Sequence, residues 1–145
     1  MKKILIINGP NLNLLGTRQP EIYGSKTFED YLSELRKENA DLVIEYYQSN
    51  IEGELIDRLQ TANRIFDGII MNAGGYTHTS VAIRDAISAI DTPVVEVHIS
   101  NIEAREEFRK HSFLTAVCLG IISGFGLNSY KIGIAAIKTY LAEAD

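Results

Sequence analysis

Short runs of apolar residues alternate along the chain with segments whose apolar residues recur at helical spacing. The first run, residues 4–7, contains no polar position, which is typical of a strand covered on both faces of a sheet. Runs at 42–47, 66–71 and 94–98 are also mostly apolar, with one or two polar residues each, and the segment 112–122 carries a fifth. The pattern therefore predicts five short strands.

Four segments between and after these runs have the periodicity of amphipathic helices. Candidate N-cap residues precede three of them: Thr27, with Asp30 in the first turn, then Asn50, and then Thr79 or Ser80. The apolar stripes expected to face inward are, in chain order, Phe28, Tyr31, Leu32 and Leu35; Ile51, Leu55, Ile56 and Leu59; Val81, Ala82, Ala86 and Ala89; and Tyr130, Ile134, Ile137 and Leu141.

Alternation of strand and helix along the whole chain predicts an α/β fold. We expect a single flavodoxin-like domain over residues 1–145, with a doubly wound five-stranded parallel sheet and helices on both faces. Ligands of such sheets bind beyond the carboxyl ends of the strands. Polar residues follow three of the predicted strands, at 8–13, 72–78 and 98–101, so the sequence predicts that these clusters share one rim.

A segment without periodicity, residues 11–24, follows the first strand and is expected to be a long loop. Loops of this length in compact domains are usually functional. Together with the rim it marks the expected site.

Composition limits the class of protein and its partners. Apolar residues make up 46% of the 145 residues and charged residues 23%, as in ordinary globular domains. The net charge of −5 provides no general field for nucleic acid, so no nucleic-acid partner is expected. The single cysteine, Cys118, lies in an apolar run and is expected to be a buried hydrophobe. The first apolar run is too short for a signal peptide or a membrane span, so we expect a cytoplasmic protein without membrane contact.

The usual ligands of this architecture lack their motifs here. There is no phosphate-binding loop ending in Gly-Lys-Ser/Thr, and the asparagine-rich first turn lacks the clustered acids of a receiver domain. Gly124 and Gly126 begin a dinucleotide-like pattern, but Ser129 replaces its third glycine, so helix packing is the simpler interpretation. No His, Cys and Asp cluster has metal-ligand spacing, so no metal and no cofactor is expected.

A base is expected in the long loop. Tyr23 has an ordinary pKa of about 10, but a guanidinium at ~4 Å stabilises a phenolate by ~3–4 kcal/mol, enough to lower that pKa by roughly 2 to 3 units. Arg18 would supply this charge if the loop brings the two side chains together. The alternative is a surface arginine and a tyrosine that only packs the loop.

An acid and an anion pocket are expected opposite. Glu96 and His98 are two apart on a strand and point to one face, so Glu96 could fix the tautomer of His98 for proton delivery. Asn72, Gly74 and Gly75 precede a helix whose free amides would favour an anion. Arg105 and Arg109 are four residues apart, and Arg109 could engage a polar substrate; alternatively, both arginines simply pair with Glu103 or Glu106. This set suits proton abstraction next to a carbonyl, followed by loss of water.

Five motifs resemble type II 3-dehydroquinate dehydratases over nearly the whole chain. They are Asn8-Gly-Pro-Asn-Leu-Asn-Leu-Leu-Gly16 with Arg18-Gln-Pro-Glu-Ile-Tyr23-Gly24, Gln48-Ser-Asn-Ile-Glu-Gly-Glu54, Tyr76-Thr-His-Thr-Ser-Val-Ala-Ile-Arg-Asp85, Glu96-Val-His-Ile-Ser-Asn-Ile102, and Arg105-Glu-Glu-Phe-Arg109.

The resemblance implies a cofactor-independent step of the shikimate pathway, the anti elimination of water from 3-dehydroquinate through an enolate. It implies Tyr23 with Arg18 as base and His98 as general acid, while Asn11 holds a water at the enolate oxygen. The substrate carboxylate would bind Asn72 and the backbone of Ile99 and Ser100. The ring hydroxyls would bind His78, Arg109 and Asp85. The resemblance also implies a homo-oligomer, trimers assembled into a dodecamer, in which Asp85 acts from a neighbouring subunit and residues 18–24 close as a lid.

Three positions depart from the usual pattern of the family. Gln19 replaces a common glutamate, Ala73 a common proline, and Glu103 a frequent histidine. None of them carries the implied chemistry, so they bear on loop kinetics and inhibitor preference. Two other functions stay open: a catalytically silent small-molecule binding module, and a structural assembly protein. Retention of both Tyr23 and His98 argues for the enzyme. The type I enzyme is excluded because its barrel needs typically ~250 residues.

Overall fold

The computed structural model describes residues 1–17 and 20–144, without the side chains of residues 22 and 23. Five parallel strands form one sheet in the order β2-β1-β3-β4-β5. The strands are β1 (Lys2–Asn8), β2 (Leu42–Gln48), β3 (Gly68–Asn72), β4 (Val94–His98) and β5 (Gly120–Ser123). The helices of more than one turn are α2 (Phe28–Glu38), α3 (Glu52–Ala62), α4 (Val81–Ala89) and α5 (Asn128–Ala144). The predicted flavodoxin-like doubly wound sheet is confirmed.

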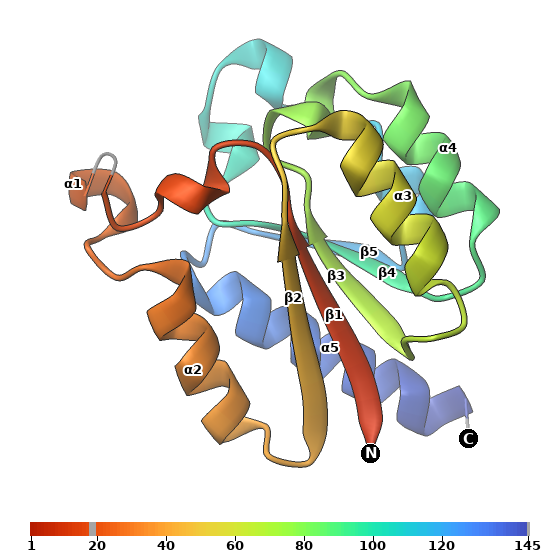
Figure 1. The fold of residues 1–145 in the computed structure, drawn as a ribbon. Helices are drawn as coiled ribbons and strands as arrows, with labels where there is room; N and C mark the ends of the chain where they lie inside the picture. The colour runs from red at the N-terminus through yellow and green to blue at the C-terminus, as the bar shows by residue number, and fades with distance from the viewer. Residues whose placement is uncertain (18–19, 145) are drawn as a thin grey trace.

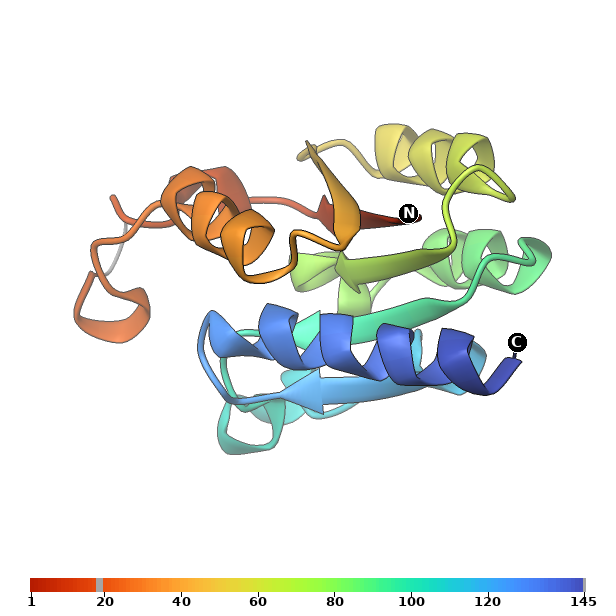
Figure 2. The ribbon, with the colours of Figure 1, turned by 90° about the horizontal axis from the view of Figure 1, so that it is seen from below.

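Helices lie on both faces of the sheet (Figures 1 and 2), and a hydrophobic cluster fills the space on each face. Helices α2 and α5 cover one face, where Phe28 and Tyr130 pack on Ile4 and Ile6. Helices α3 and α4 cover the other, where Leu5 and Ile7 face Leu55 and Ile83 in the second cluster. All four residues at positions 4–7 have no exposed surface, which explains why this strand lacks polar positions.

Local signals placed two helix starts correctly. Thr27 and Asp30 form a reciprocal capping box, in which each side chain accepts a hydrogen bond from the backbone of the other. Ser80, one of the two candidates, caps α4 by accepting from the amide of Ile83 at 2.9 Å.

The inward stripe predicted for α4 is wrong except for Ala86. The buried residues are Ile83, Ala86 and Ile87, while Val81 is 54% exposed and Ala82 and Ala89 are also exposed. The larger isoleucines remove more apolar area from water, and this decides the orientation of the helix.

Asn50 does not cap α3 as predicted, because the N-cap residue is Ile51 and it has no side-chain cap. The Oδ1 atom of Asn50 instead accepts from the backbone of Asn11 at 2.9 Å and from Gln48 at 3.1 Å. The expected long loop after β1 also contains two short helices, η1 (Leu12–Leu14) and α1 (Pro20–Tyr23).

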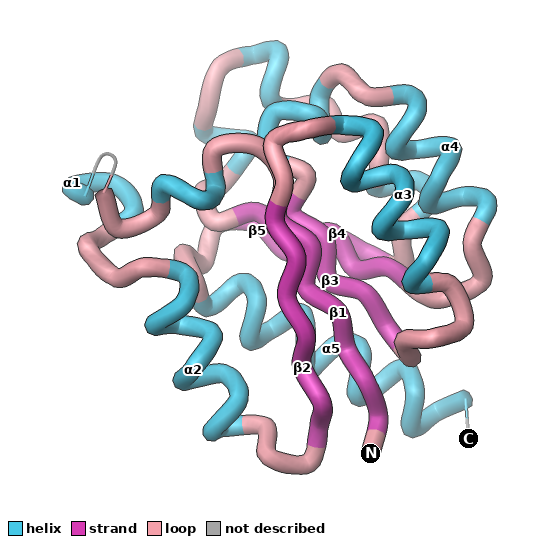
Figure 3. The backbone as a smooth tube through the Cα atoms, in the orientation of Figure 1, coloured by secondary structure: helices cyan, strands magenta, loops and turns pink. Residues whose placement is uncertain are grey.

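The loops that follow β1, β3 and β4 leave the sheet at the same end (Figure 3). They contain, besides η1 and α1, the short helices η2 (Gly74–His78), η3 (Ile102–Ala104) and η4 (Glu107–Arg109); a further one, η5 (Thr115–Val117), precedes β5. The loop with α1 projects away from the sheet (Figure 1). The polar clusters therefore do share one rim, as predicted.

Candidate active site

A pocket of about 180 Å³ opens on this rim between the loops after β1, β3 and β4. Nine of the predicted site residues line it: Asn11, Asn72, Gly74, Gly75, His78, His98, Ile99, Ser100 and Arg109. Its wall also includes Pro10, Leu12, Leu14, Leu15, Ile102 and Arg105. The fold thus gathers residues from three separate segments of the chain into one cavity.

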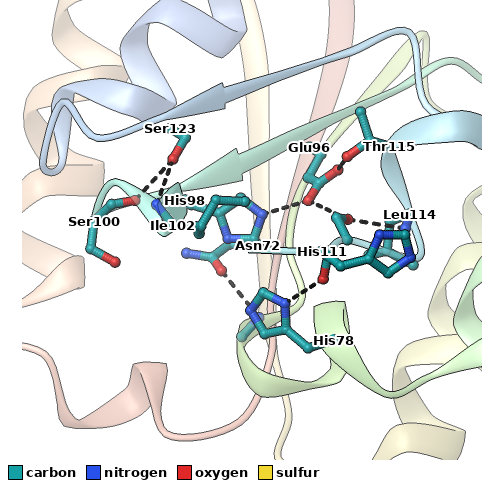
Figure 4. A network of polar contacts seen from close by, with 12 residues as sticks. Asn72, His78, Glu96, His98, Ser100, Ile102, His111, Leu114, Thr115 and Ser123 are labelled. Atoms are coloured by element: carbon teal, nitrogen blue, oxygen red, sulfur yellow. Dashed lines mark hydrogen bonds and ion pairs between the residues drawn. The ribbon is translucent and has the colours of Figure 1, made fainter. Parts of the chain in front are cut away.

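Glu96 and His98 form a buried pair behind the pocket wall (Figure 4). The Nε2 atom of His98 lies 2.5 Å from Oε2 of Glu96, and both side chains are nearly inaccessible. The predicted contact between these residues is therefore present. Because Glu96 takes Nε2, Nδ1 is the ring nitrogen left for chemistry in the pocket that His98 lines.

Three donors converge on the Glu96 carboxylate. Besides His98, Ser112 donates to Oε2 at 2.8 Å and Thr115 donates to Oε1 at 2.5 Å. Burial acts to raise the pKa of Glu96, but the hydrogen bonds from His98 and Thr115, the charge of His98 and the bond from Ser112 outweigh it and hold the pKa below its ordinary value. Glu96 is therefore an ionised acceptor that fixes the ring of His98.

Asn72 ends β3 at the floor of the pocket. Its Oδ1 accepts from the amide of Gly74 at 3.1 Å, and its Nδ2 donates to the hydroxyl of Tyr130 at 3.0 Å. Gly74 has φ +60°, and a Cβ there would lie 3.1 Å from the carbonyl oxygen of Pro10, so the turn requires glycine. The amide of Gly74 is thus already used and is not free for an anion, contrary to the prediction. Gly74 and Gly75 themselves begin the short η2, and α4 begins at Val81, after its cap at Ser80.

His78 faces the pocket as a neutral acceptor. Its Nδ1 lies 2.8 Å from the carbonyl oxygen of His111, which can only accept, so Nδ1 carries the proton and Nε2 has a free lone pair. Burial lowers the pKa of His78, and the charges of His98 and Arg109 act in the same direction, against the hydrogen bond to His111. The rings of His78 and His98 are stacked with centroids 6.4 Å apart.

The two arginines lie at the outer side of the pocket. Arg109 donates to Glu106 at 2.5 Å, so one of the expected pairings forms, although Arg109 also lines the cavity. Arg105 lines it too and donates to the hydroxyl of Ser100 at 3.4 Å. Arg105 lies four residues before Arg109, and this spacing was the feature of the sequence that could have predicted its place in the pocket wall.

Four predicted residues are not among the described residues that line the pocket. Glu96 lies behind His98. Asp85 is exposed on α4 and does not line the pocket formed by this chain. Arg18 and the side chain of Tyr23 lie outside the described residues. The contact expected between these last two therefore stays a prediction.

Sequence reasoning missed the groups that hold the site from behind. Ser112, Thr115 and Tyr130 contact Glu96 or Asn72 without lining the cavity. The apolar wall formed by Leu12, Leu14 and Leu15 was also missed. The only feature of the sequence that pointed to these leucines is their position in the long loop motif. That position does not show which side chains face the pocket.

Other predicted features can be placed in the described part of the chain. Cys118 is half-buried, and burial together with the charge of Glu96 raises the pKa of its thiol to about 12, which makes it a poor nucleophile. Within residues 1–17 and 20–144, no group of three or more His, Cys, Asp or Glu side chains is placed to hold a metal ion. No helix among these residues is both long and apolar enough to cross a bilayer.

Comparison with known proteins agrees with this site. Residues 2–138 match the sequence profile of the family Dehydroquinase class II. A 3-dehydroquinate dehydratase of Prochlorococcus marinus (strain MIT 9515) is 56% identical over 140 residues, covering 95% of this chain and 96% of the relative. The type II dehydroquinase of Propionibacterium acnes superposes with a TM-score of 0.91 at 38% identity, covering 96% of this chain and 97% of that one. That of Butyrivibrio crossotus DSM 2876 gives a TM-score of 0.88 at 46% identity, over 94% and 97%. The chain therefore belongs to the class II dehydroquinase family.

Proposed function

We propose that this protein is a hydro-lyase that removes water from 3-dehydroquinate to give 3-dehydroshikimate. The observation that carries the proposal is the buried Glu96–His98 pair at the wall of a pocket formed by the family's motifs. An ionised carboxylate on Nε2 leaves Nδ1 of His98 to deliver a proton into the pocket. The likeness to 3-dehydroquinate dehydratases supplies the substrate.

The proposed reaction is an anti elimination in two steps. Tyr23, as a phenolate stabilised by Arg18, takes the proton on the carbon next to the ketone, and the electron pair of that C–H bond forms an enolate. The enolate then collapses, the C–O bond to the departing hydroxyl breaks, and His98 protonates that hydroxyl so that water leaves. Tyr23 then loses the proton it took to solvent, and His98 takes one proton back from solvent, so the cycle needs no cofactor.

The remaining site residues bind the substrate in this proposal. Asn72 and the backbone of Ile99 and Ser100 hold the carboxylate, and Asn11 holds a water at the enolate oxygen. His78 and Arg109 contact ring hydroxyls. All of these residues line the pocket, which supports the assignment.

Asp85 is proposed to reach a ring hydroxyl in the site of a neighbouring subunit, since it is exposed and lies outside the pocket of its own chain. This requires a homo-oligomer, which we propose to be a dodecamer built from four trimers. Light scattering tests the assembly, because a mass near the monomer's 16.1 kDa in the active protein contradicts it.

The direct test is turnover of 3-dehydroquinate in the presence of EDTA, followed by the absorbance of the conjugated product. Tyr23→Phe, Arg18→Ala and His98→Ala are each expected to lower kcat by at least ~10²-fold, the usual scale for acid–base groups. Thermal unfolding of each variant controls for loss of fold. Near-normal rates in all three variants would contradict the mechanism, and no turnover by the wild type would contradict the function and favour a binding or assembly role.

A further inference from the structure

The hydroxyl of Tyr130 lies at the centre of a buried chain of hydrogen bonds behind the pocket. It donates to Oδ1 of Asn8 at 2.7 Å and accepts from Nδ2 of Asn72 at 3.0 Å. Nδ2 of Asn8 in turn donates to Tyr46 at 3.3 Å. Tyr130 and Asn8 have no exposed surface, and Asn72 is only 4% exposed. Of these four residues, only Asn72 lines the pocket.

The direction of each bond in this chain is fixed by its ends. The backbone N–H of Gly74 can only donate, so the group of Asn72 that faces it must be Oδ1, and Nδ2 must then face Tyr130. A hydroxyl has a single proton, and Tyr130 gives it to Asn8, which leaves a lone pair for Asn72. Burial raises the pKa of Tyr130 far above neutrality, so the hydroxyl keeps its proton. Asn72 cannot turn over without breaking a bond at both ends.

This arrangement determines what Asn72 offers to a ligand. Its Oδ1 is occupied by Gly74, and one N–H of Nδ2 is occupied by Tyr130. The second N–H of Nδ2 has no partner within the described part of the chain. We propose that Tyr130 is a positioning residue that holds Asn72 as a hydrogen-bond donor and thereby selects a carboxylate for that end of the pocket. The inference rests on the proposed function and adds a residue to it that touches no substrate.

Tyr31 offers a matched control for Tyr130. It packs in the same hydrophobic cluster, and the ring centroids of the two tyrosines are 6.4 Å apart. Its hydroxyl is buried as well, but has no hydrogen-bond partner in the described residues. Tyr31→Phe and Tyr130→Phe therefore remove the same atom from the same region, and only the second breaks the chain to Asn72.

The experiment combines these variants with two ligands that do not react. Quinate carries the ring carboxylate, and its analogue with CH₂OH in place of the carboxylate is neutral; calorimetry gives the Kd of each. We expect Tyr130→Phe to raise the Kd of quinate by about 10-fold and that of the neutral analogue by less than about 2-fold. Only binding of the carboxylate depends on the N–H donor of Asn72. The KM for 3-dehydroquinate should rise by a similar factor, with a smaller change in kcat. Tyr31→Phe should change none of these values by more than about 2-fold.

If Tyr130→Phe raises the Kd of both ligands equally, its role is merely structural and the proposal is overturned. If the variant binds quinate with wild-type affinity, the proposal is also overturned. Asn8→Ala is the second variant, should Tyr130→Phe fail to fold. It removes the acceptor of the Tyr130 proton. It should therefore also raise the Kd of quinate more than that of the neutral analogue, but by a smaller factor than Tyr130→Phe does. If the wild type binds quinate but does not turn over 3-dehydroquinate, the proposed function fails and the inference stands. If the wild type does not bind quinate, the inference fails, while turnover of 3-dehydroquinate still decides the proposed function.

Discussion

The two sides of the pocket are built in different ways. On the sheet side, Asn72 and His98 lie at the ends of strands and are each no more than 6% exposed, and every bond that orients them is buried or nearly so. On the loop side, Asn11 lies next to the short helix η1 and Arg109 ends the short helix η4, and both are oriented by exposed partners. Asn11 also has φ 71°, a left-handed conformation that costs a non-glycine residue roughly 1–2 kcal/mol.

This difference separates chemistry from substrate capture. Groups fixed by several buried hydrogen bonds keep their positions whether or not a ligand is present, as acid catalysis requires. Groups on the loops can rearrange when a substrate arrives. We therefore expect changes on the sheet side to act mainly on kcat, unless they alter the carboxylate end, and changes on the loop side to act mainly on KM.

After the three acid–base variants described above, the largest effect is expected from Glu96→Gln. The amide keeps the size of the side chain and one acceptor for His98, and the hydroxyl of Thr115 can reverse to accept from the new NH₂ group. What is lost is the negative charge beside the ring of His98, so kcat should fall at least ~10-fold with little change in KM. Steady-state kinetics measures both. Thr115→Val, which removes one donor and keeps the carboxylate, should lower kcat much less; an equal fall in the two variants would contradict the role of the charge.

Glu96→Gln also tests whether the negative charge of Glu96 stabilises the folded protein. The folded-state pKa of Glu96 lies below its ordinary value of 4.5, so ionisation of Glu96 stabilises the fold above about pH 4.5, and this contribution is lost as the pH falls through the folded-state pKa. In urea unfolding, the difference between wild type and Glu96→Gln should therefore shrink on acidification from pH 7 to about pH 3. A difference that does not change with pH would show that folding does not lower the pKa of Glu96.

The sheet side was also the more predictable from sequence. The side chains of Glu96 and His98 are two residues apart on a strand, so strand geometry alone placed them on one face. Tyr130 could not be found in this way, because 58 residues separate it from Asn72 and 122 from Asn8. Periodicity predicts that a tyrosine faces inward, but not which polar group its hydroxyl meets. The fold itself was predictable because each strand and most helices carry their own local pattern.

The loop side was predicted less well. Asn50 had the composition of a helix cap, but its side chain bonds to Asn11, 39 residues away, which no local rule indicates. The role of Gly74 was mistaken for a related reason: a glycine before a helix suggests a free amide, but the side chain of Asn72, two residues earlier, uses that amide.

Asn50→Ala should have an intermediate effect. The change removes the acceptor for the backbone amide of Asn11 and leaves the left-handed turn there without support. We expect KM to rise by about 3- to 10-fold with kcat within about 3-fold of wild type, since a lost hydrogen bond is worth about 1 kcal/mol. The control is Asn63→Ala, because the side chain of Asn63 likewise accepts from the backbone, from the amides of Asp91 and Thr92, but away from the pocket. A comparable rise in KM for the control would contradict a local effect.

The smallest effect is expected where the loop side is held by an exposed ion pair. Glu106→Gln removes the charge that holds Arg109. Glu106 is the N-cap residue of η4, and Arg109, three residues later, is the last residue of this helix. Exposed pairs contribute little to stability, so the melting temperature should not change measurably. The guanidinium is then no longer shared with Glu106, so KM for 3-dehydroquinate should fall, by up to about 3-fold. Glu107→Gln is the matched control: Glu107 pairs with Lys110 at the same spacing, and neither residue lines the pocket. A rise in KM for Glu106→Gln would instead show that the ion pair holds Arg109 in its binding position, and that the loop side is as preorganised as the sheet side.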